Sequence, residues 1–579
     1  MEFVTIGAGW TAGIIAQQLT AAGHEVVSID RGQPRWTTPD FEHNHDTLKY
    51  VARLELMHRL EKESWTWRPS PSARALPMRM YGSFHPGDGY GGAGVHWAAQ
   101  TWRFYPSDFK YRSHHVERYG EDALPEGSTI QDWPVSYEDL EPYYDRYEWD
   151  VGVSGQAGNV QGQIREGGNP FEGPRQRGYP LPPLVTSLAG SLFADAAESL
   201  GNHPFPQPAS ILSEAYTDLS GRTRSGCLYC GFCTRYGCEV DAKASAIVSH
   251  LPMALDTGRY EIRPGCVVTR IEVDGSGRAT GVRYVDDAGR EHVQPADTVV
   301  VAAYPLGNVK LLLSSRSDAH PDGVGNDEGL VGRNFTYQLV KSPVSGVFEG
   351  RRFNQFMGNS CLQAVIHDFN ADNFDHSGLG FIGGASMTCG GGERQPLTSV
   401  GGMPVGDGPR WGQQWKEDLR RNWDSVVGIS IQGESLPYED QYMDLDPTYT
   451  DAWGLPLLRL TFDWHRNDYL LYRYLTERAT EIMRAMGASK VAATEGLTPY
   501  NLAPYQSTHI TGGAIMGDDP SHSVTNRYGQ VWDTPNVFVT GATLYPQNPG
   551  MNPTGTLVAL SYLTAEALNE RYQHGELLT

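Results

Sequence analysis

The chain has 579 residues, of which 46 are basic and 68 acidic, giving a formal net charge of −22. Its length exceeds the ~250–300 residues at which one hydrophobic core stops growing, so we expect two joined domains. The negative charge argues against nucleic acid or an anionic membrane as a direct partner, and no apolar run reaches the ~18 residues of a membrane-spanning helix.

The amino end predicts a dinucleotide site. Residues 3–6 predict a strand, 7–9 a glycine turn and 10 to about 22 a helix. A second strand follows at 25–29 and ends in Asp30. Gly7 permits the tight turn, Gly9 lets a pyrophosphate approach the backbone, and Ala12 stands where helix and strand pack closely. The helix N-terminus faces the phosphates, and Asp30 can bind a ribose hydroxyl. The motif does not separate NAD from FAD, and a plain βαβ unit with a glycine-rich turn is the alternative.

A second glycine cluster, GDGYGGAGVHW, occupies residues 87–97 and ends in His96-Trp97. Its glycines let the backbone pass close to a flat or phosphorylated group: Gly89, Gly91, Gly92 and Gly94. With these motifs the chain resembles the glucose–methanol–choline (GMC) oxidoreductase family. Among its members it looks most like the flavoprotein subunits of bacterial sugar and sugar-acid dehydrogenases, and it is also similar to the pyranose oxidases. The resemblance covers most of the chain and is weakest at about 345–500.

The resemblance implies an α/β fold in which a Rossmann-like FAD-binding domain with a β-meander joins a substrate domain built on a β-sheet with helices. It assigns residues 1–160, 220–335 and 500–579 to the FAD-binding domain, and 161–219 and 336–499 to the substrate domain. FAD then replaces NAD as the expected cofactor. The positions expected at the cofactor are Gly7, Gly9, Ala12, Asp30, Arg31, Gly91, Gly92, His96, Trp97, Val268, Gly541, Asn552 and Thr554.

The resemblance also suggests how the flavin is attached. In the similar dehydrogenases the histidine of the His-Trp pair is bonded covalently to the flavin 8α-methyl, and the corresponding residue is His96. A neutral imidazole nitrogen is a competent nucleophile for that activated methyl. The alternative is a packed histidine with two hydrogen bonds, because many members of the family hold FAD non-covalently.

Four cysteines are crowded into residues 227–238: Cys227, Cys230, Cys233 and Cys238. Thiolates this close in sequence can hold one iron–sulfur cluster. There are three alternatives: a zinc site, structural thiols or a disulfide. Zinc usually binds two separated pairs of cysteines. The dehydrogenases that the chain resembles carry a three-iron cluster in the corresponding interval, with a different spacing, so a 3Fe-4S or 4Fe-4S cluster is implied. Cys266, Cys361 and Cys389 are expected to be isolated packing residues.

Residues 259–303 predict a β-meander with hairpin turns at 274–277 and 286–289. Residues 298–303 resemble the family's strand that returns to the nucleotide site. We also expect helices at 466–487 and 553–572, and a mobile loop or lid at 379–409.

The carboxyl end supplies candidate catalytic groups. His509 precedes a Gly-Gly pair and Asn552 lies in an Asn-Pro-Thr-Gly-Thr turn that opens a helix. On its own, His509 could be a satisfied core histidine. The resemblance makes it the base that removes a hydroxyl proton, since a free imidazole with a pKa of ~6.5 suits neutral pH. It makes Asn552 the group that holds the hydroxyl and aligns the C–H bond with flavin N5.

Together these features predict oxidation of a secondary or anomeric hydroxyl of a sugar, sugar acid or glycoside. Electrons would pass to a small partner subunit or a cytochrome. The alternatives are an oxidase of the pyranose-oxidase type that uses oxygen, and an electron-transfer subunit with a vestigial substrate site. Because residues 3–6 already predict a strand, we expect no signal peptide, and either co-export to the periplasm with a partner subunit or a cytoplasmic enzyme.

Overall fold

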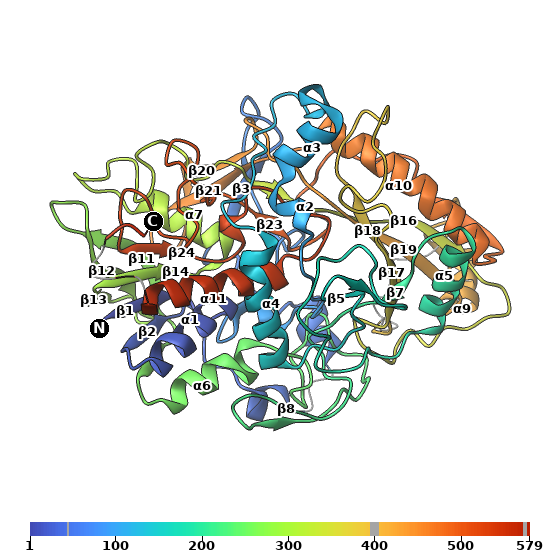
Figure 1. The fold of residues 1–579 in the computed structure, drawn as a ribbon, viewed down its shortest axis with the longest axis horizontal. Coiled ribbons are helices and arrows are strands. Elements are labelled where there is room, and N and C mark those ends of the chain that lie inside the picture. Colours follow the sequence, from blue (N-terminus) through green and yellow to red (C-terminus); the bar gives the residue numbers. More distant parts are fainter. Residues whose placement is uncertain (43–45, 394–404, 571, 573–575, 579) are drawn as a thin grey trace.

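The computed structural model describes residues 1–42, 46–393, 405–570, 572 and 576–578. It shows two sheets at opposite ends of an elongated molecule (Figure 1). One is a five-stranded sheet that begins at the amino end, and the other is a six-stranded sheet formed from the middle of the chain. Within the described residues no helix has both the length and the apolar character to span a bilayer.

The five-stranded sheet is entirely parallel, in the order β10-β2-β1-β14-β24. Its central strands are fully buried, as expected of a parallel sheet with both faces covered. On one face α1 packs against α6 and α11, and on the other lie α7 and a β-meander (Figure 1). The predicted Rossmann-like arrangement is therefore confirmed. The bounds are β1 Phe3–Ile6, α1 Trp10–Ala21, β2 Val26–Ile29, α6 His250–Asp256, β10 Tyr260–Arg263, β14 Thr298–Val301, α7 Tyr304–Ser314, β24 Val537–Val539 and α11 Thr554–Glu570.

The meander consists of β11 (Val267–Val273), β12 (Ala279–Val285) and β13 (Glu291–Pro295), all antiparallel. Both predicted hairpin turns are present for the same local reason. Asp274 Oδ1 accepts hydrogen bonds from the backbone N–H groups two and four residues later, and Asp286 Oδ1 does the same. Such aspartate turns need no help from distant parts of the chain, which is why the sequence predicts them well.

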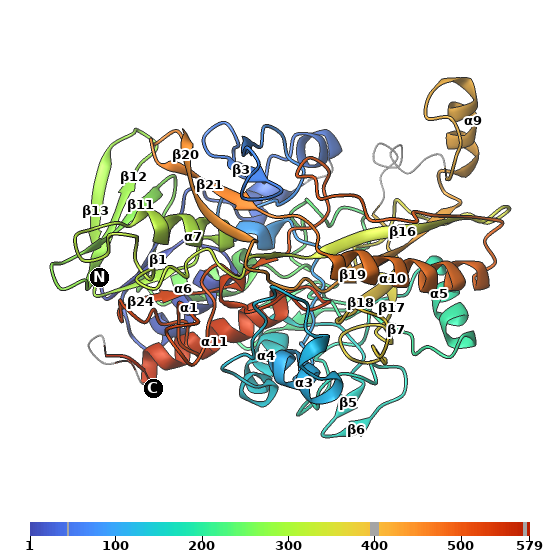
Figure 2. The same ribbon diagram turned by 90° about the horizontal axis from the view of Figure 1, so that it is seen from above.

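The six-stranded sheet has the order β22-β16-β19-β18-β17-β7. Helices α10 and α5 pack on one face and against each other (Figure 2). The predicted helix at 466–487 is α10, whose buried residues Leu471, Leu475, Ala479 and Met483 recur every four positions. The bounds are α5 Leu188–Ser199, β7 Phe205–Pro206, β16 Leu339–Val347, β17 Gln363–Ile366, β18 Ala385–Gly390, β19 Val426–Gly433, α10 Arg466–Ala485 and β22 Lys490–Ala493.

Strand β18 corrects the prediction of a loop or lid at 379–409. Residues 385–390 form a central strand between β17 and β19, with Ala385, Met387 and Cys389 buried on one face. The many glycines nearby suggested a loop, and only three alternating buried residues mark the strand in the sequence. Hydrogen bonding to strands on both sides stabilises it all the same. Residues 394–404, the core of the predicted lid, lie outside the described residues.

A smaller sheet joins segments that were assigned to different domains. Strand β3 (Trp65–Arg68) pairs in parallel with β21 (Pro456–Thr461), which pairs with β20 (Tyr442–Thr450), and β4 (Leu76–Pro77) completes the sheet. This backbone pairing binds residues near the amino end to the middle of the chain. The domain division itself stays a prediction.

A buried ionic network holds the segment that follows the second glycine cluster. Arg103 makes two 2.9 Å bonds to the Glu148 carboxylate and a third, also 2.9 Å, to Glu141. Arg175 also binds Glu148, and the side chains of Arg103, Arg175 and Glu148 are at most 3% exposed. Both glutamates lie on α4 (Tyr137–Val151), which packs on α11. The network therefore fixes the chain around residue 103 against α4.

Substituting Arg103→Ala leaves buried carboxylates short of a partner, so we expect the free energy of unfolding to fall by ~3–5 kcal/mol. Urea unfolding followed by circular dichroism measures this loss. Arg177→Ala is the control, because the Arg177–Asp145 pair has an arginine side chain that is 50% exposed and should contribute ~0–1 kcal/mol. Equal losses in the two variants would show that the network is energetically unimportant.

Candidate active site

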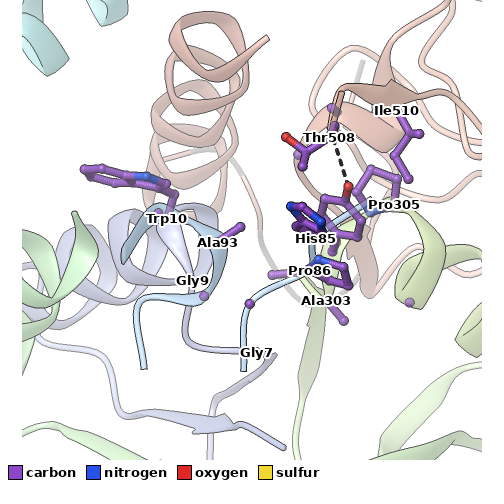
Figure 3. Close-up of a pocket in the computed structure, with 18 of the residues that line it drawn as sticks. Gly7, Gly9, Trp10, His85, Pro86, Ala93, Ala303, Pro305, Thr508 and Ile510 are labelled. Carbon is purple, nitrogen blue, oxygen red and sulfur yellow. Dashed lines mark hydrogen bonds between the residues drawn. The ribbon is translucent and has the colours of Figure 1, made fainter. Parts of the chain in front are cut away.

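A cavity of about 450 Å³ lies where the carboxyl ends of β1, β14 and β24 meet the six-stranded sheet. Ligands of open α/β sheets bind at this edge. Gly9, Trp10 and Ala93 lie across the cavity from His85, Pro305 and Thr508 (Figure 3). Of the residues predicted at the cofactor or in catalysis, the cavity wall contains Gly7, Gly9, Asp30, Arg31, Gly92, His96, Trp97, Val268, His509, Gly541, Asn552 and Thr554.

The first glycine turn is shaped to receive a phosphate. Gly7 has φ +102°, and a Cβ there would stand 2.8 Å from the Ala302 carbonyl oxygen. A Cβ on Gly9 would meet nothing within 4 Å, so the backbone is open on the cavity side. Gly9 also caps α1 without a side-chain acceptor, which leaves the first N–H groups of the helix available to an anion.

Asp30 holds this turn against the end of β2. Its carboxylate accepts 2.8 Å hydrogen bonds from Ala8 N and Gly32 N, while burial raises the pKa of the carboxyl. Two other predicted residues lie behind the cavity wall. Ala12 is fully buried in α1, and Gly91 N donates to Ala8 O at 2.8 Å. Both support the turn from behind.

The region beside Arg31 contains paired charges that we did not predict. Arg31 Nη1 lies 2.9 Å from Glu63 Oε2, and Lys310 Nζ bonds to both Glu63 and Asp451, the latter at 2.6 Å. Burial alone would raise the pKa of Glu63, but Lys310 and Arg31 bring it down to about 2. These residues are spread over some 400 positions of sequence, and no local motif marks them.

Two buried polar atoms of residues in the cavity wall have no hydrogen-bond partner within the protein. His96 is buried with no hydrogen-bond partner for Nε2, and burial, before any neighbouring charge, lowers its pKa well below the ordinary value. Trp10 Nε1 is also buried without a partner. Buried polar atoms are rarely left unpaired, and both residues line this one cavity. Together with the glycine turn, they fit a bound dinucleotide whose polar ring system reaches His96.

His509 and Asn552 meet in the wall of the same cavity. His509 Nε2 lies 3.1 Å from Asn552 Nδ2, and His509 Nδ1 lies 2.6 Å from Gln338 Oε1. Antiparallel pairing of β23 (Ile510–Thr511) with β15 (Thr336–Tyr337) places Gln338 beside His509. Loss of hydration lowers the pKa of His509 to about 4, so the imidazole is neutral at neutral pH.

Five lining or supporting residues were not assigned a role from the sequence: Trp102, Arg235, Gln338, Gln432 and Tyr505. Trp102 Nε1 donates to Asn552 Oδ1 at 2.8 Å, and Gln432 Nε2 donates to Gln338 Oε1 at 3.0 Å. The Arg235 guanidinium lies 5.2 Å from the ring centroid of Tyr505. Among the described residues no carboxylate lies within ion-pair distance of Arg235, although the Glu393 carboxylate accepts hydrogen bonds from Thr234, the residue before it.

The four crowded cysteines do not line the cavity, although Thr234 and Arg235 between them do. All four are free thiols, and burial raises the pKa of Cys227, Cys230 and Cys233. In the described part of the chain only His320, Asp327 and Asp533 bring three ligand atoms within 4.8 Å of one another. Zn–S bonds are ~2.3 Å long, so this arrangement of thiols does not surround a zinc ion.

Cys361 corrects a prediction. It was expected to be isolated, yet it packs in one buried cluster with Cys233 and the partly buried Cys227. The cluster lies against the second glycine segment, because the buried Lys243 Nζ donates to Cys233 O at 2.7 Å and to Trp97 O at 3.1 Å. The cysteine segment is thus tied to the residues beside His96.

Comparisons with known proteins identify the family of the chain. Models of the GMC oxidoreductase family match residues 215–340 and 437–561. The chain is 40% identical to the gluconate 2-dehydrogenase flavoprotein of Pantoea cypripedii, over 99% of this chain and 94% of that protein. It is 28% identical to the 2-methyl-1,2-propanediol dehydrogenase of Mycolicibacterium austroafricanum (99% and 95% covered) and to the fructose dehydrogenase large subunit of Gluconobacter japonicus (99% and 98%).

A solved structure shares the fold. The crystal structure of pyridoxine 4-oxidase from Mesorbium loti has a TM-score of 0.60 and 17% identity, covering 99% of this chain and 100% of that one. The full-length 40% match and the two family models establish what the glycine motifs suggested. The chain is a member of the GMC oxidoreductase family, and thus an FAD-dependent enzyme that oxidises CH–OH groups.

Proposed function

We propose that this enzyme oxidises a secondary or anomeric hydroxyl of a sugar, sugar acid or glycoside and passes the electrons to a redox partner. The observation that carries the proposal is the neutral His509, whose Nε2 lies 3.1 Å from Asn552 Nδ2 in the wall of the cofactor cavity. When bound, FAD supplies the acceptor for the hydride that leaves the substrate carbon.

The protein's own groups handle the proton. His509 Nε2 takes the hydroxyl proton, and Asn552 Nδ2 donates a hydrogen bond to the same hydroxyl oxygen, which orients the carbon's C–H bond. General-base assistance of this kind contributes ~10²–10⁴-fold to a rate. His509 is half-buried in the cavity wall, and the partial loss of hydration lowers its pKa and keeps the imidazole neutral between turnovers.

Arg235 favours an acidic substrate. In a chain with a net charge of −22, it places a half-buried cation in the cavity wall without a described acid partner. A carboxylate on the substrate would supply that partner through charge-assisted hydrogen bonds. The name of the 40% identical relative, a gluconate 2-dehydrogenase flavoprotein, is consistent with a sugar acid.

We propose a redox partner as the electron acceptor. The relative named as the large subunit of fructose dehydrogenase is one part of an assembly, which supports a small partner subunit or a cytochrome here. We derive no electron route through an iron–sulfur cluster. The cluster and the covalent bond to His96 stay predictions.

Cofactor content tests both of these predictions in one sample. If His96 is bonded to the flavin, acid precipitation leaves a yellow pellet from the wild type and a colourless pellet from a still flavin-loaded His96→Ala variant. A colourless wild-type pellet rules out the bond. Iron and acid-labile sulfide close to stoichiometric with flavin would establish the cluster, and their absence would remove it.

Replacing His509 with alanine should lower kcat by ~10²–10⁴-fold without loss of bound flavin. Wild-type kcat/KM should stay level down to about pH 5.5, since the base is lost only near its pKa of about 4, whereas an ordinary imidazole titrates near ~6.5. Stopped-flow flavin reduction across pH measures both effects. His522→Ala, in an exposed turn, is the control. Full activity in the His509 variant would favour a vestigial site.

A substrate panel tests the function itself. With a dye acceptor we expect oxidation of sugar acids in preference to the matching neutral sugars, and slow peroxide formation with oxygen alone. Rapid peroxide formation would instead identify an oxidase. Arg235→Gln should lower kcat/KM for the acid by ~10–100-fold and leave the neutral sugar nearly unchanged. The control is Arg478→Gln, whose guanidinium lies 5.5 Å from the Tyr474 ring away from the cavity.

A further inference from the structure

Two carboxamides hold the imidazole of His509, and the orientation of each can be read from its other partners. Gln338 is fully buried, and its Nε2 lies 2.6 Å from Pro549 O and 2.9 Å from Met551 O. Backbone carbonyl oxygens only accept hydrogen bonds, so the NH₂ group must face them. The amide oxygen of Gln338 therefore faces His509 Nδ1.

The second carboxamide is fixed from the opposite side. Trp102 Nε1 lies 2.8 Å from Asn552 Oδ1. An indole N–H only donates, so Oδ1 must face Trp102, and the NH₂ group of Asn552 must face His509 Nε2 at 3.1 Å. Neither amide can be turned over without setting two donors or two acceptors against each other.

These two orientations leave one arrangement of protons on the ring. Nδ1 faces only acceptor oxygen at 2.6 Å and must carry the hydrogen, while Nε2 faces a donor and must be bare. We infer that Gln338 is the positioning residue that fixes His509 in its Nδ1–H tautomer, so that Nε2, which faces the Asn552 amide, is the bare nitrogen that can take the substrate's proton. The link to catalysis rests on the proposed function, but the tautomer does not.

The acceptor at Nδ1 is neutral, and so are the other groups around His509. Burial is the sole cause of its lowered pKa, with no charged side chain contributing. The titratable neighbours are the phenols of Tyr304 and Tyr337, which donate to Thr508 O at 2.9 Å and Ser507 O at 2.8 Å, and burial raises the pKa of both. A carboxylate in place of Gln338 would therefore be the first charge beside the ring.

Gln338 also connects the base to the six-stranded sheet. Gln432 on β19 lines the cavity and donates to the same Gln338 oxygen at 3.0 Å. When Nε2 accepts the hydroxyl proton, the substrate O–H bond breaks and an N–H bond forms; FAD, when bound, would accept the hydride released as the C–H bond breaks. Nδ1–H stays bonded to Gln338 throughout, so the ring keeps its orientation as its charge changes.

Two substitutions in the FAD-loaded enzyme test the inference. Gln338→Glu places an anion against Nδ1, and we expect the acid limb of the kcat/KM profile to move up from about 4 by at least one pH unit. Gln338→Met removes the acceptor, and kcat should fall ~10-fold or more while KM changes little. An unmoved acid limb in Gln338→Glu, or full kcat in Gln338→Met, would overturn the assignment.

Gln530→Met is a matched control for the loss of buried hydrogen bonds. Gln530 is also fully buried, and its Nε2 donates to Pro535 O at 2.7 Å and Glu576 O at 2.8 Å. We expect a comparable fall in Tm with no change in the pH profile. A matching kinetic loss in this control would mean that Gln338 acts only through stability.

A readout without substrate separates this inference from the proposed function. Ring ¹⁵N resonances of histidine-labelled protein, assigned with His509→Asn, should show protonated Nδ1 and bare Nε2 at neutral pH, and mixed tautomers in Gln338→Met. An Nε2–H ring in the wild type would refute the inference even if alcohols are oxidised. An enzyme that oxidises none of the panel but shows the expected ring would refute only the function.

Discussion

The parallel pairing of β14 with β1 on one side and β24 on the other is the constraint on which the site depends. It aligns residues 3–6, 298–301 and 537–539 in register, although they come from the beginning, middle and end of the chain. The loops that leave their carboxyl ends then share one edge of the sheet. The glycine turn, the start of α7 and the segment before α11 meet there because the strands beneath them are hydrogen-bonded to one another.

The two ends of the cavity on this edge differ in charge: one has paired ionic side chains and the other has only neutral polar groups. Near Arg31 the charges are paired with one another, as Glu63 shows by its depressed pKa. Around His509 the hydrogen-bonding groups are carboxamides, an indole and phenols, so the base is oriented by dipoles without a neighbouring charge. Arg235 stands apart from both regions as a cation with no described acid partner. A ligand that carries negative charge at one end and hydroxyls at the other suits this distribution.

What the sequence could predict follows from how local each feature is. The glycine turn, both aspartate hairpins and the helix beginning at Thr554 depend on neighbours within a few residues, and all were anticipated. Gln338, Gln432 and Trp102 were not, because their roles come from partners 94 to 450 positions away. Cys361 looked isolated for the same reason. Strand β18 was missed because pairing with two other strands outweighed its glycine-rich surroundings.

The position of β24 has a consequence for how the protein is made. The last strand of the nucleotide sheet, Asn552 and α11 all lie in the final tenth of the chain. At ~5–20 residues per second, synthesis of the earlier segments takes about half a minute to two minutes. Throughout that time β14 lacks its outer neighbour β24, although β1 already has β2 and later β14 beside it. The cofactor site is therefore complete only after Asn552 and Thr554 have been added, more than 500 residues after the glycine turn.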